Sequence, residues 1–209
     1  MAMTPAVGLG ALALALVAAL SACQGSSTPT ADPSTSATSG PTSPSPDPTS
    51  PSPTSTSPSD EASAQAIALV PNYLKTIDDL FSAPTLSPNR LHHVAVGSEF
   101  RIEVATLLSF RRKGYRQSGS SQLVKATVGA VSLTNHPNAS PPRVPTIAVR
   151  ACVDVSAVQV TDATGKSIVP VGRPNYLVEQ LLLTNHQYPD PSGWRVSHAP
   201  NKQAASCDG

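Results

Sequence analysis

Positive charge is missing from the first part of this chain. Residues 1–60 contain no Lys or Arg, whereas all 14 basic residues and ten of the 13 acidic residues follow, so the later part has a net charge of about +4. Nucleic-acid-binding domains concentrate basic residues on one face. A charge this small and scattered excludes that class of partner and supports at most a mild attraction to anionic envelope surfaces.

The sequence also lacks an apolar run long enough for a typical membrane span. Residues 6–20 consist only of Ala, Val, Leu and Gly, about 15 residues in all, which fits the apolar region of a signal peptide. We therefore predict a signal peptide over residues 1–22. Residues 1–5 lack the usual positive charge of such a segment, and a start further upstream would account for this.

The sequence has three cysteines, an odd number, of which one is Cys23 and the other two lie much later in the chain. The apolar run ends in Leu20, Ser21, Ala22 and Cys23, which resembles the bacterial lipobox, in which the thiol is acylated before cleavage on its N-terminal side. Two or more acyl chains give stable anchoring. We expect Cys23 to carry them and to hold the protein on the extracytoplasmic face of the cell membrane.

Large apolar residues are absent from the segment that follows. Among the 37 residues from Gln24 to Asp60 there are twelve Ser, eight Thr and nine Pro, and no aliphatic residue larger than Ala. Such a composition cannot offset chain entropy by burial and favours polyproline II. We predict that residues 23–60 form a lipidated, disordered tether that gives the domain reach, with O-glycosylation as a further hypothesis.

Residues 61–209 have the patterns of a folded domain. Apolar residues from Ala66 to Phe81 recur at helical spacing, with Asp60 as N-cap and with Pro71 marking either the helix start or a kink. A short helix is predicted over 91–96 and a longer one over 98–113, with Gly114 after its end. The longer helix is expected to bury its apolar residues, namely Phe100, Val104, Leu107 and Leu108, with Ile102 and Phe110 as further candidates.

After Gly114 the period changes to two, which predicts strands over 123–134, 144–155, 158–160, 167–169, 176–184 and 194–198. Gly129 indicates a bulge in the first strand, and residues 162–165 indicate a hairpin turn. Helices followed by an antiparallel sheet are typical of the α+β class. In an exported domain the two remaining cysteines, Cys152 and Cys207, are expected to form a disulfide.

The order of these elements resembles the nuclear transport factor two-like cone fold, and more closely actinobacterial lipoproteins built on it. The motifs that carry the likeness are Tyr73-Leu74, Asp78-Asp79-Leu80, Arg112-Lys113-Gly114, residues 149–155, residues 193–196 and Cys207. The resemblance implies N-terminal helices packed on a curved sheet of five or six strands. Some relatives of this fold are isomerases or dehydratases with an Asp or His base in the cone, but no motif places such a residue on this chain.

Three sets of polar residues are candidate sites. Asp154 could act as a base inside a cone or pair with Arg150 on the sheet surface. A basic cluster could contact an anion or could cap a helix end; its members are Arg111, Arg112, Lys113 and Arg116. The five His residues show no metal-ligand spacing, so no metal and no cofactor are expected.

The sequence thus predicts a membrane-anchored envelope lipoprotein whose domain acts as a binding or scaffold module. Its expected partners are the membrane, through Cys23, and an envelope protein, a cell-wall polymer or a small ligand. The alternatives are an isomerase or dehydratase that uses the cone pocket, and a surface immunity or exclusion factor.

Overall fold

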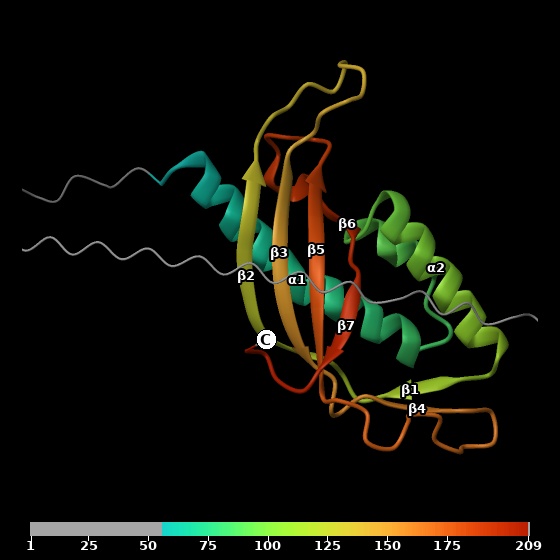
Figure 1. Cartoon of the computed structure of the whole chain (residues 1–209). Helices are drawn as coiled ribbons and strands as arrows, with labels where there is room; N and C mark the ends of the chain where they lie inside the picture. Colours follow the sequence, from blue (N-terminus) through green and yellow to red (C-terminus); the bar gives the residue numbers. More distant parts are fainter. Residues whose placement is uncertain (1–55, 209) are drawn as a thin grey trace, which may run out of the picture. The chain divides into compact units, whose positions relative to one another are not determined.

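The structure, a computed structural model, describes residues 56–208. The predicted signal peptide, the lipobox residues Leu20 to Cys23 and the tether up to residue 55 lie outside these residues. Figure 1 shows the described part as a sheet crossed by one long helix, with a second helix at its side.

The first helix, α1 (Pro58–Ser82), begins three residues before the predicted start. Its N-cap is Ser57, whose Oγ accepts a 3.1 Å hydrogen bond from the amide of Asp60, so the prediction of Asp60 as N-cap was wrong. Ser at the N-cap followed by Pro at the first helical position is a strong start signal. Ser57 and Pro58 lie in the Ser- and Pro-rich segment before residue 60, and for that reason the sequence predicts them to be part of the tether.

Helix α1 continues through Pro71, so the helix does not begin there. Pro71 lies on the exposed side, and the buried side contains Ala62, Ala66, Val70, Tyr73, Leu74 and Leu80. The chain then forms a 3-10 helix, η1 (Pro88–His93), close to the predicted short helix, and enters α2 (Gly97–Arg112).

Helix α2 ends at Arg112 with Lys113 as its C-cap, and Gly114, which the sequence predicts as the cap, is the next residue. This glycine has a φ of +69°, and the amides of Gly114 and Tyr115 donate to the carbonyls of Arg111 and Phe110. The predicted apolar face of α2 was wrong in part, because Leu108 is 42% exposed and Ile102 is 52% exposed, whereas Glu99 and Leu107 are buried.

Seven strands follow in two sheets. The main antiparallel sheet has the order β2 (Gln122–Ser132), β3 (Thr146–Asp154), β5 (Tyr176–Asn185) and β6 (Trp194–His198), with β7 (Asn201–Ala204) also paired to β5. A register shift between Val128 and Val131 confirms the bulge at Gly129. The inward face of β3 is the predicted one, with Ile147, Val149, Ala151 and Val153 buried.

Strands β6 and β7 lie along the same edge of β5. Strand β6 pairs with residues 182–185 and β7 with residues 176–179, and between them the carbonyl of Pro200 accepts from the amide of Gln180. Strand β7 was not predicted, because its sequence Asn-Lys-Gln-Ala has no apolar alternation. It nevertheless forms one side of the site described below.

The predicted hairpin around residues 162–165 forms only in part. Strand β4 (Gln159–Thr161) pairs with the unpredicted β1 (Arg116–Ser118), and its contact with the following segment is a single bridge between Thr161 and Ser167. The turn itself is present, since Asp162 Oδ1 accepts hydrogen bonds from the amides of Thr164 and Lys166. Strands β1 and β4 lie beyond the lower end of the main sheet in Figure 1.

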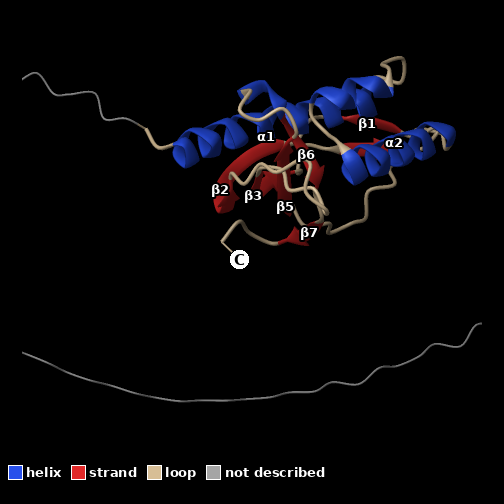
Figure 2. Cartoon of the chain, turned by 90° about the horizontal axis from the view of Figure 1, so that it is seen from above, coloured by secondary structure: helices blue, strands red, loops and turns tan. Residues whose placement is uncertain are grey.

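Both long helices pack on one side of the main sheet (Figure 2). Buried residues of α1 meet the inner faces of β3, β5 and β6 in one apolar core, and Trp194 Nε1 donates to Gln65 Oε1 across it. The domain is therefore α+β, with helices covering one face of an antiparallel sheet of five strands.

Candidate functional site

A cavity of about 370 Å³ lies between the two helices and the lower part of the main sheet. Its walls come from α1, α2, β3, β5, β7 and the segments around β1 and β4. Most of its apolar lining is aliphatic, with one phenyl ring: Leu74, Ile77, Phe81, Val153, Val155, Val158 and Leu177. Its size and mixed lining are typical of small-molecule pockets.

Helix α2 turns two carboxylates toward the inside of the domain. Glu99, Glu103 and Leu107 follow at intervals of four residues and therefore share one helix face. Glu99 is only 3% exposed, and Glu103 lines the cavity. The apolar spacing of α2 predicts a buried face of apolar residues alone, and it does not reveal these two acids.

Tyr73 on α1 partners the first of these acids. Its hydroxyl donates a 2.7 Å hydrogen bond to Glu99 Oε1 in a buried contact between residues 26 positions apart. Burial, together with the charges of Glu103 and Glu99, raises the pKa of the Tyr73 phenol far above its usual value. Tyr73 is therefore held as a neutral hydrogen-bond donor at the cavity wall.

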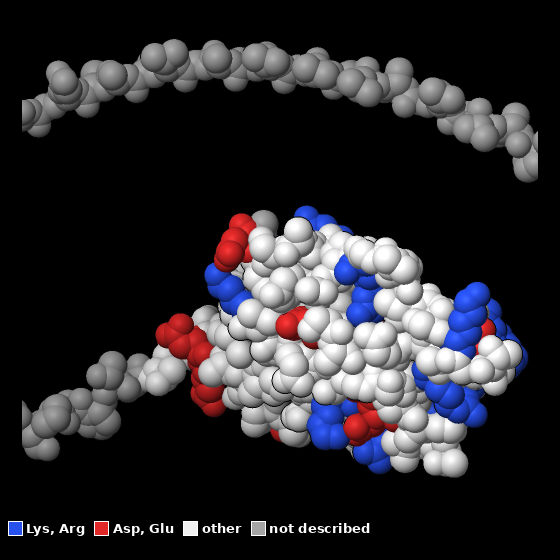
Figure 3. Space-filling view, turned by 90° about the horizontal axis from the view of Figure 1, so that it is seen from below, with Lys and Arg blue, Asp and Glu red and all other residues white. Residues whose placement is uncertain are grey.

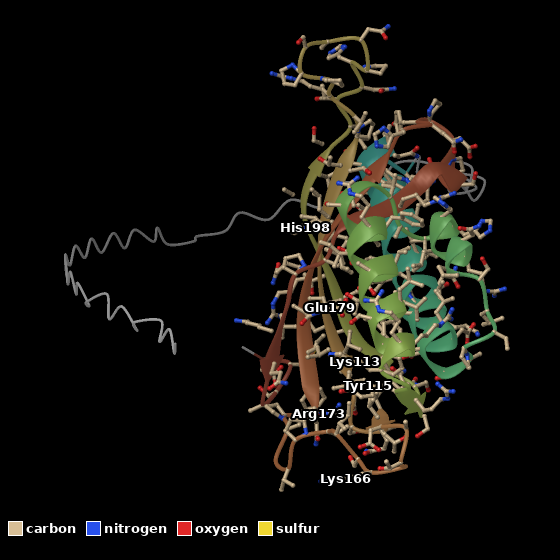
Figure 4. All side chains as sticks on the ribbon, turned by 90° about the vertical axis from the view of Figure 1, so that its right-hand side faces the viewer. Lys113, Tyr115, Lys166, Arg173, Glu179 and His198 are labelled. Carbon is tan, nitrogen blue, oxygen red and sulfur yellow. A yellow bond between two sulfur atoms is a disulfide. The ribbon has the colours of Figure 1, made fainter. Side chains whose placement is uncertain are left out.

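The sheet contributes a third carboxylate, Glu179 on β5. Strand parity places it on the inner face between Leu177 and Leu181, and its side chain is 8% exposed. Its Oε2 is buried and accepts no hydrogen bond from the described residues. Figure 4 shows Glu179 beside α2, with Arg173 nearer the loops at the lower end.

Glu103 and Glu179 have strongly perturbed acidities. Burial, followed by the charges of Glu99 and Glu179 and a hydrogen bond with Glu99, raises the pKa of Glu103 to about 7. Burial and the charge of Glu99 raise the pKa of Glu179 to about 7 as well. Like charges in a low-dielectric site resist joint ionisation. The two carboxyls therefore gain and lose their protons near neutral pH, and not at about pH 4 as exposed carboxyls do.

The other charged groups of the cavity are already engaged in structure. Asp78 accepts from Gln117 Nε2 at 2.8 Å and from the amide and hydroxyl of Ser121 at 2.8 and 2.7 Å, which holds β1 and the start of β2 against α1. Arg173 donates to the carbonyls of Val155 and Val158 at 2.6 and 3.0 Å. Neither Asp78 nor Arg173 forms a hydrogen bond with the unpartnered Oε2 of Glu179.

Asp154 and Arg150 lie away from this cavity. Both are on the outer face of β3, where Arg150 is opposite Gln180 of β5 in register. Hydrogen bonds from Ser156, first from its side chain and then from its amide at 2.7 Å, lower the pKa of the Asp154 carboxyl. It caps the turn after β3, and the pairing of Arg150 with Asp154 stays a prediction.

The basic cluster is divided among several structural contacts. Arg111 donates to the carbonyls of Leu80 and Ala83 at the C-terminal end of α1. Lys113 lies 5.6 Å from the ring centre of Tyr115, and Arg116 donates to the Tyr115 carbonyl. On the face seen in Figure 3, Lys and Arg lie in several separate groups.

Cys152 and Cys207 are joined by a disulfide, as predicted. Between residues 56 and 208 no group of three or more His, Cys, Asp or Glu is arranged to hold a metal ion. Over the same residues no helix combines the length and the apolar character needed to cross a bilayer.

Comparisons with known proteins identify no family for this chain. No family model matches it, and a search of curated proteins finds no match. Among solved structures, the chain is similar to the intermembrane space region of the chloroplast protein ARC6, with 12% identity and a TM-score of 0.45 over 68% of this chain and 96% of that one. A likeness at this TM-score supports no conclusion about function.

Proposed function

We propose that this protein is an envelope lipoprotein, held on the extracytoplasmic face of the membrane by acylated Cys23, whose domain binds a small ligand. The lipobox at Leu20 to Cys23 supports the anchor, and a disulfide in the domain fits an oxidising compartment. We further propose that the sheet and helices form a shallow cone of the nuclear transport factor two-like type. The cavity between α1, α2 and β5 would be the interior of that cone.

One observation carries the ligand-binding proposal. The cavity of about 370 Å³ has an apolar wall and, at one point of that wall, the buried oxygen Glu179 Oε2 without a donor from the described residues. A buried acceptor left unpaired costs about 1–3 kcal/mol, and more when charged, so such groups call for a functional explanation. A ligand that supplies the missing donor provides one.

Filling the cavity tests this proposal. In the Leu177→Trp variant an indole would occupy the space beside Glu179. The control is Leu182→Trp, which places the same ring on the opposite face of the same strand, at a residue that is 38% exposed. The readout is fluorine NMR of neutral fluorinated aromatic fragments added to the full chain in lipid nanodiscs. We expect binding to the wild type and to Leu182→Trp, and its loss in Leu177→Trp; equal binding to all three, or to none, would contradict the proposal.

The anchor is tested separately. A Cys23→Ser chain should incorporate no labelled palmitate and should leave the membrane fraction, whereas Ser26→Ala, three residues further on, should behave as the wild type. Firm membrane association of Cys23→Ser would overturn the lipid anchor.

A second candidate function is acid–base catalysis of the isomerase or dehydratase type. The observation that favours it is the pair of cavity carboxyls, Glu103 and Glu179, with pKa values of about 7, which suit a general base and a general acid at neutral pH. Small carbonyl compounds in D₂O would then exchange their α-protons for deuterium in the presence of the wild type. They would not do so in the presence of Glu179→Gln. Absence of exchange across such a panel would leave binding as the function.

A further inference from the structure

The cavity contains more negative charge than the surrounding residues compensate. Asp78, Glu103 and Glu179 line it, and Glu99 accepts the hydrogen bond of Tyr73, whereas Arg173 is the one Lys or Arg among the described residues of the lining. Its guanidinium is directed to the carbonyls of Val155 and Val158. The site is thus locally acidic, although the chain after residue 60 has a net charge of about +4.

Hydrogen-bond donors are distributed unevenly over these four acids, and Asp78 accepts three of them. Glu99 receives the Tyr73 hydroxyl at 2.7 Å, whereas Glu179 Oε2 is buried, at a residue exposure of 8%, and receives none from the described residues. The unpartnered acceptor and the cavity are independent observations, and they coincide at one wall. What is missing there is a donor, preferably a positively charged one.

From this geometry we infer that the ligand is a small organic monocation, an amine whose ammonium group binds between Glu179 and Glu103 and whose apolar body packs on Leu74, Ile77 and Leu177. This inference rests on the proposed ligand-binding function and specifies its ligand class. An ammonium group is a compact charge with three donors, which allows one group to bond two carboxylates. The aromatic rings of Tyr73 and Phe81, both in the lining, add favourable faces for a cation.

The apolar wall determines the rest of the ligand. On the sheet side Val153, Val155 and Leu177 surround Glu179 without a second acid, and Asp78 on α1 already accepts three hydrogen bonds from Gln117 and Ser121, so the second charge of a dication would be buried unpaired. The chemistry therefore selects one ammonium group on an aliphatic or aromatic body. A neutral isostere would keep the apolar contacts and leave Glu179 without a charged donor.

Binding of such a cation is coupled to proton release. Below neutral pH the carboxyls of Glu103 and Glu179 are largely protonated, and an ammonium group must displace those protons. The other ionisable groups that face Glu179 are Tyr73, Asp78, Glu99 and Arg173. Because binding displaces one proton, the affinity for the amine increases about tenfold for each unit by which the pH rises toward the carboxyl pKa. Above that pKa the affinity no longer depends on the pH.

The experiment is equilibrium dialysis of the full chain in lipid nanodiscs against 2-phenylethylamine and its neutral isostere 2-phenylethanol, with empty nanodiscs as the blank. At pH 8 we expect the amine to bind at least about tenfold more tightly than the alcohol, and this preference to disappear at pH 5. The isosteric Glu179→Gln should lose the preference while retaining the alcohol, and the exposed Glu61→Gln should retain both properties.

The outcomes separate the inference from the function on which it rests. If both compounds bind equally at pH 8 and both are lost in Leu177→Trp, the cavity binds ligands and the cation preference is overturned. If neither compound binds, the proposed function fails as well. Tighter binding of the anion 3-phenylpropanoate than of the amine would also overturn the inference. If Glu179→Gln does not fold, Glu103→Gln takes its place, and loss of the preference for the amine in that variant would support the inference.

Discussion

The Tyr73 hydroxyl on α1 donates a hydrogen bond of 2.7 Å to Glu99 Oε1 on α2, and this buried contact joins the two helices beside the cavity. Arg111 also joins α2 to α1, at the C-terminal end of α1, where it donates to the carbonyls of Leu80 and Ala83. The bond that Tyr73 makes from the cavity lining therefore contributes, with the apolar packing of Leu107, to holding α2 and Glu103 in place.

Tyr73→Phe should destabilise the domain by about 1.5–3 kcal/mol, because it leaves a buried carboxylate oxygen without its donor. Tyr115→Phe is the matched control: its ring contacts Phe110 edge to face, and that contact survives removal of the hydroxyl. Urea unfolding followed by circular dichroism measures both. A Tyr73→Phe chain as stable as Tyr115→Phe would show that the Tyr73–Glu99 bond contributes little.

The stability of the domain should fall as the pH rises from about 5 to about 7. Folding raises the pKa values of Glu103 and Glu179 from 4.5 to about 7, so in this window the folded chain binds more protons than the unfolded chain. Stability then decreases with pH, by at most about 3 kcal/mol for each fully shifted carboxyl, and levels off above pH 7.

The double variant Glu103→Gln/Glu179→Gln should remove most of that slope in urea unfolding at pH 5, 6 and 7.5. The difference from the wild type removes the titration of the groups that both chains share, and Glu61→Gln, at an exposed acid of α1, shows the effect of losing a carboxyl that is not buried. A slope of the same size in the double variant would mean that neither carboxyl is perturbed as described.

Removal of the disulfide should cost about 4 kcal/mol, because Cys152 and Cys207 are 55 residues apart and their bridge restricts the unfolded chain. The double Ala variant avoids a lone buried thiol at Cys152, which is 1% exposed. Guanidinium unfolding of wild type and variant, each with and without reductant, gives the difference. Reductant should lower the stability of the wild type alone.

Gly119 should tolerate a side chain far less well than Gly165. Both have positive φ values, +73° and +86°, so Ala at either position costs about 1–2 kcal/mol of backbone strain. A Cβ at Gly119 would in addition overlap the carbonyl oxygen of Ala157, whereas nothing lies within 4 Å at Gly165. Thermal melts should therefore rank Gly119→Ala clearly below Gly165→Ala, and equal melting temperatures would contradict the predicted overlap.

Local patterns predicted the class of the fold and most of its elements. The alternation of Ile147 to Val153, the glycine after α2 and the bulge at Gly129 each depend on one segment alone, and the structure confirms them. The start of α1 and the pairing of β1 with β4 were missed. The first was hidden by tether-like composition, and the second is a contact between short, distant segments without apolar alternation.

The candidate site was not predicted, because its carboxylates occupy positions that a hydrophobic pattern assigns to the core. Glu99 and Glu103 precede Leu107 on one helix face, and Glu179 has the parity of Leu177 and Leu181. An acid at a core position is the signal that could have found them. Asp154 was weighed instead, although its own parity places it on the opposite face of β3 from the buried Val153.

The bridge between Cys152 and Cys207 closes β4, β5, β6 and β7 into a covalent ring. A peptidase cut at the fully exposed Val171 would open this ring without releasing a fragment. Glu179 on β5 and Asn201 on β7 both follow the cut and would remain attached to β3 through the disulfide alone, so a nicked chain would keep the sheet wall of its cavity in one covalent piece.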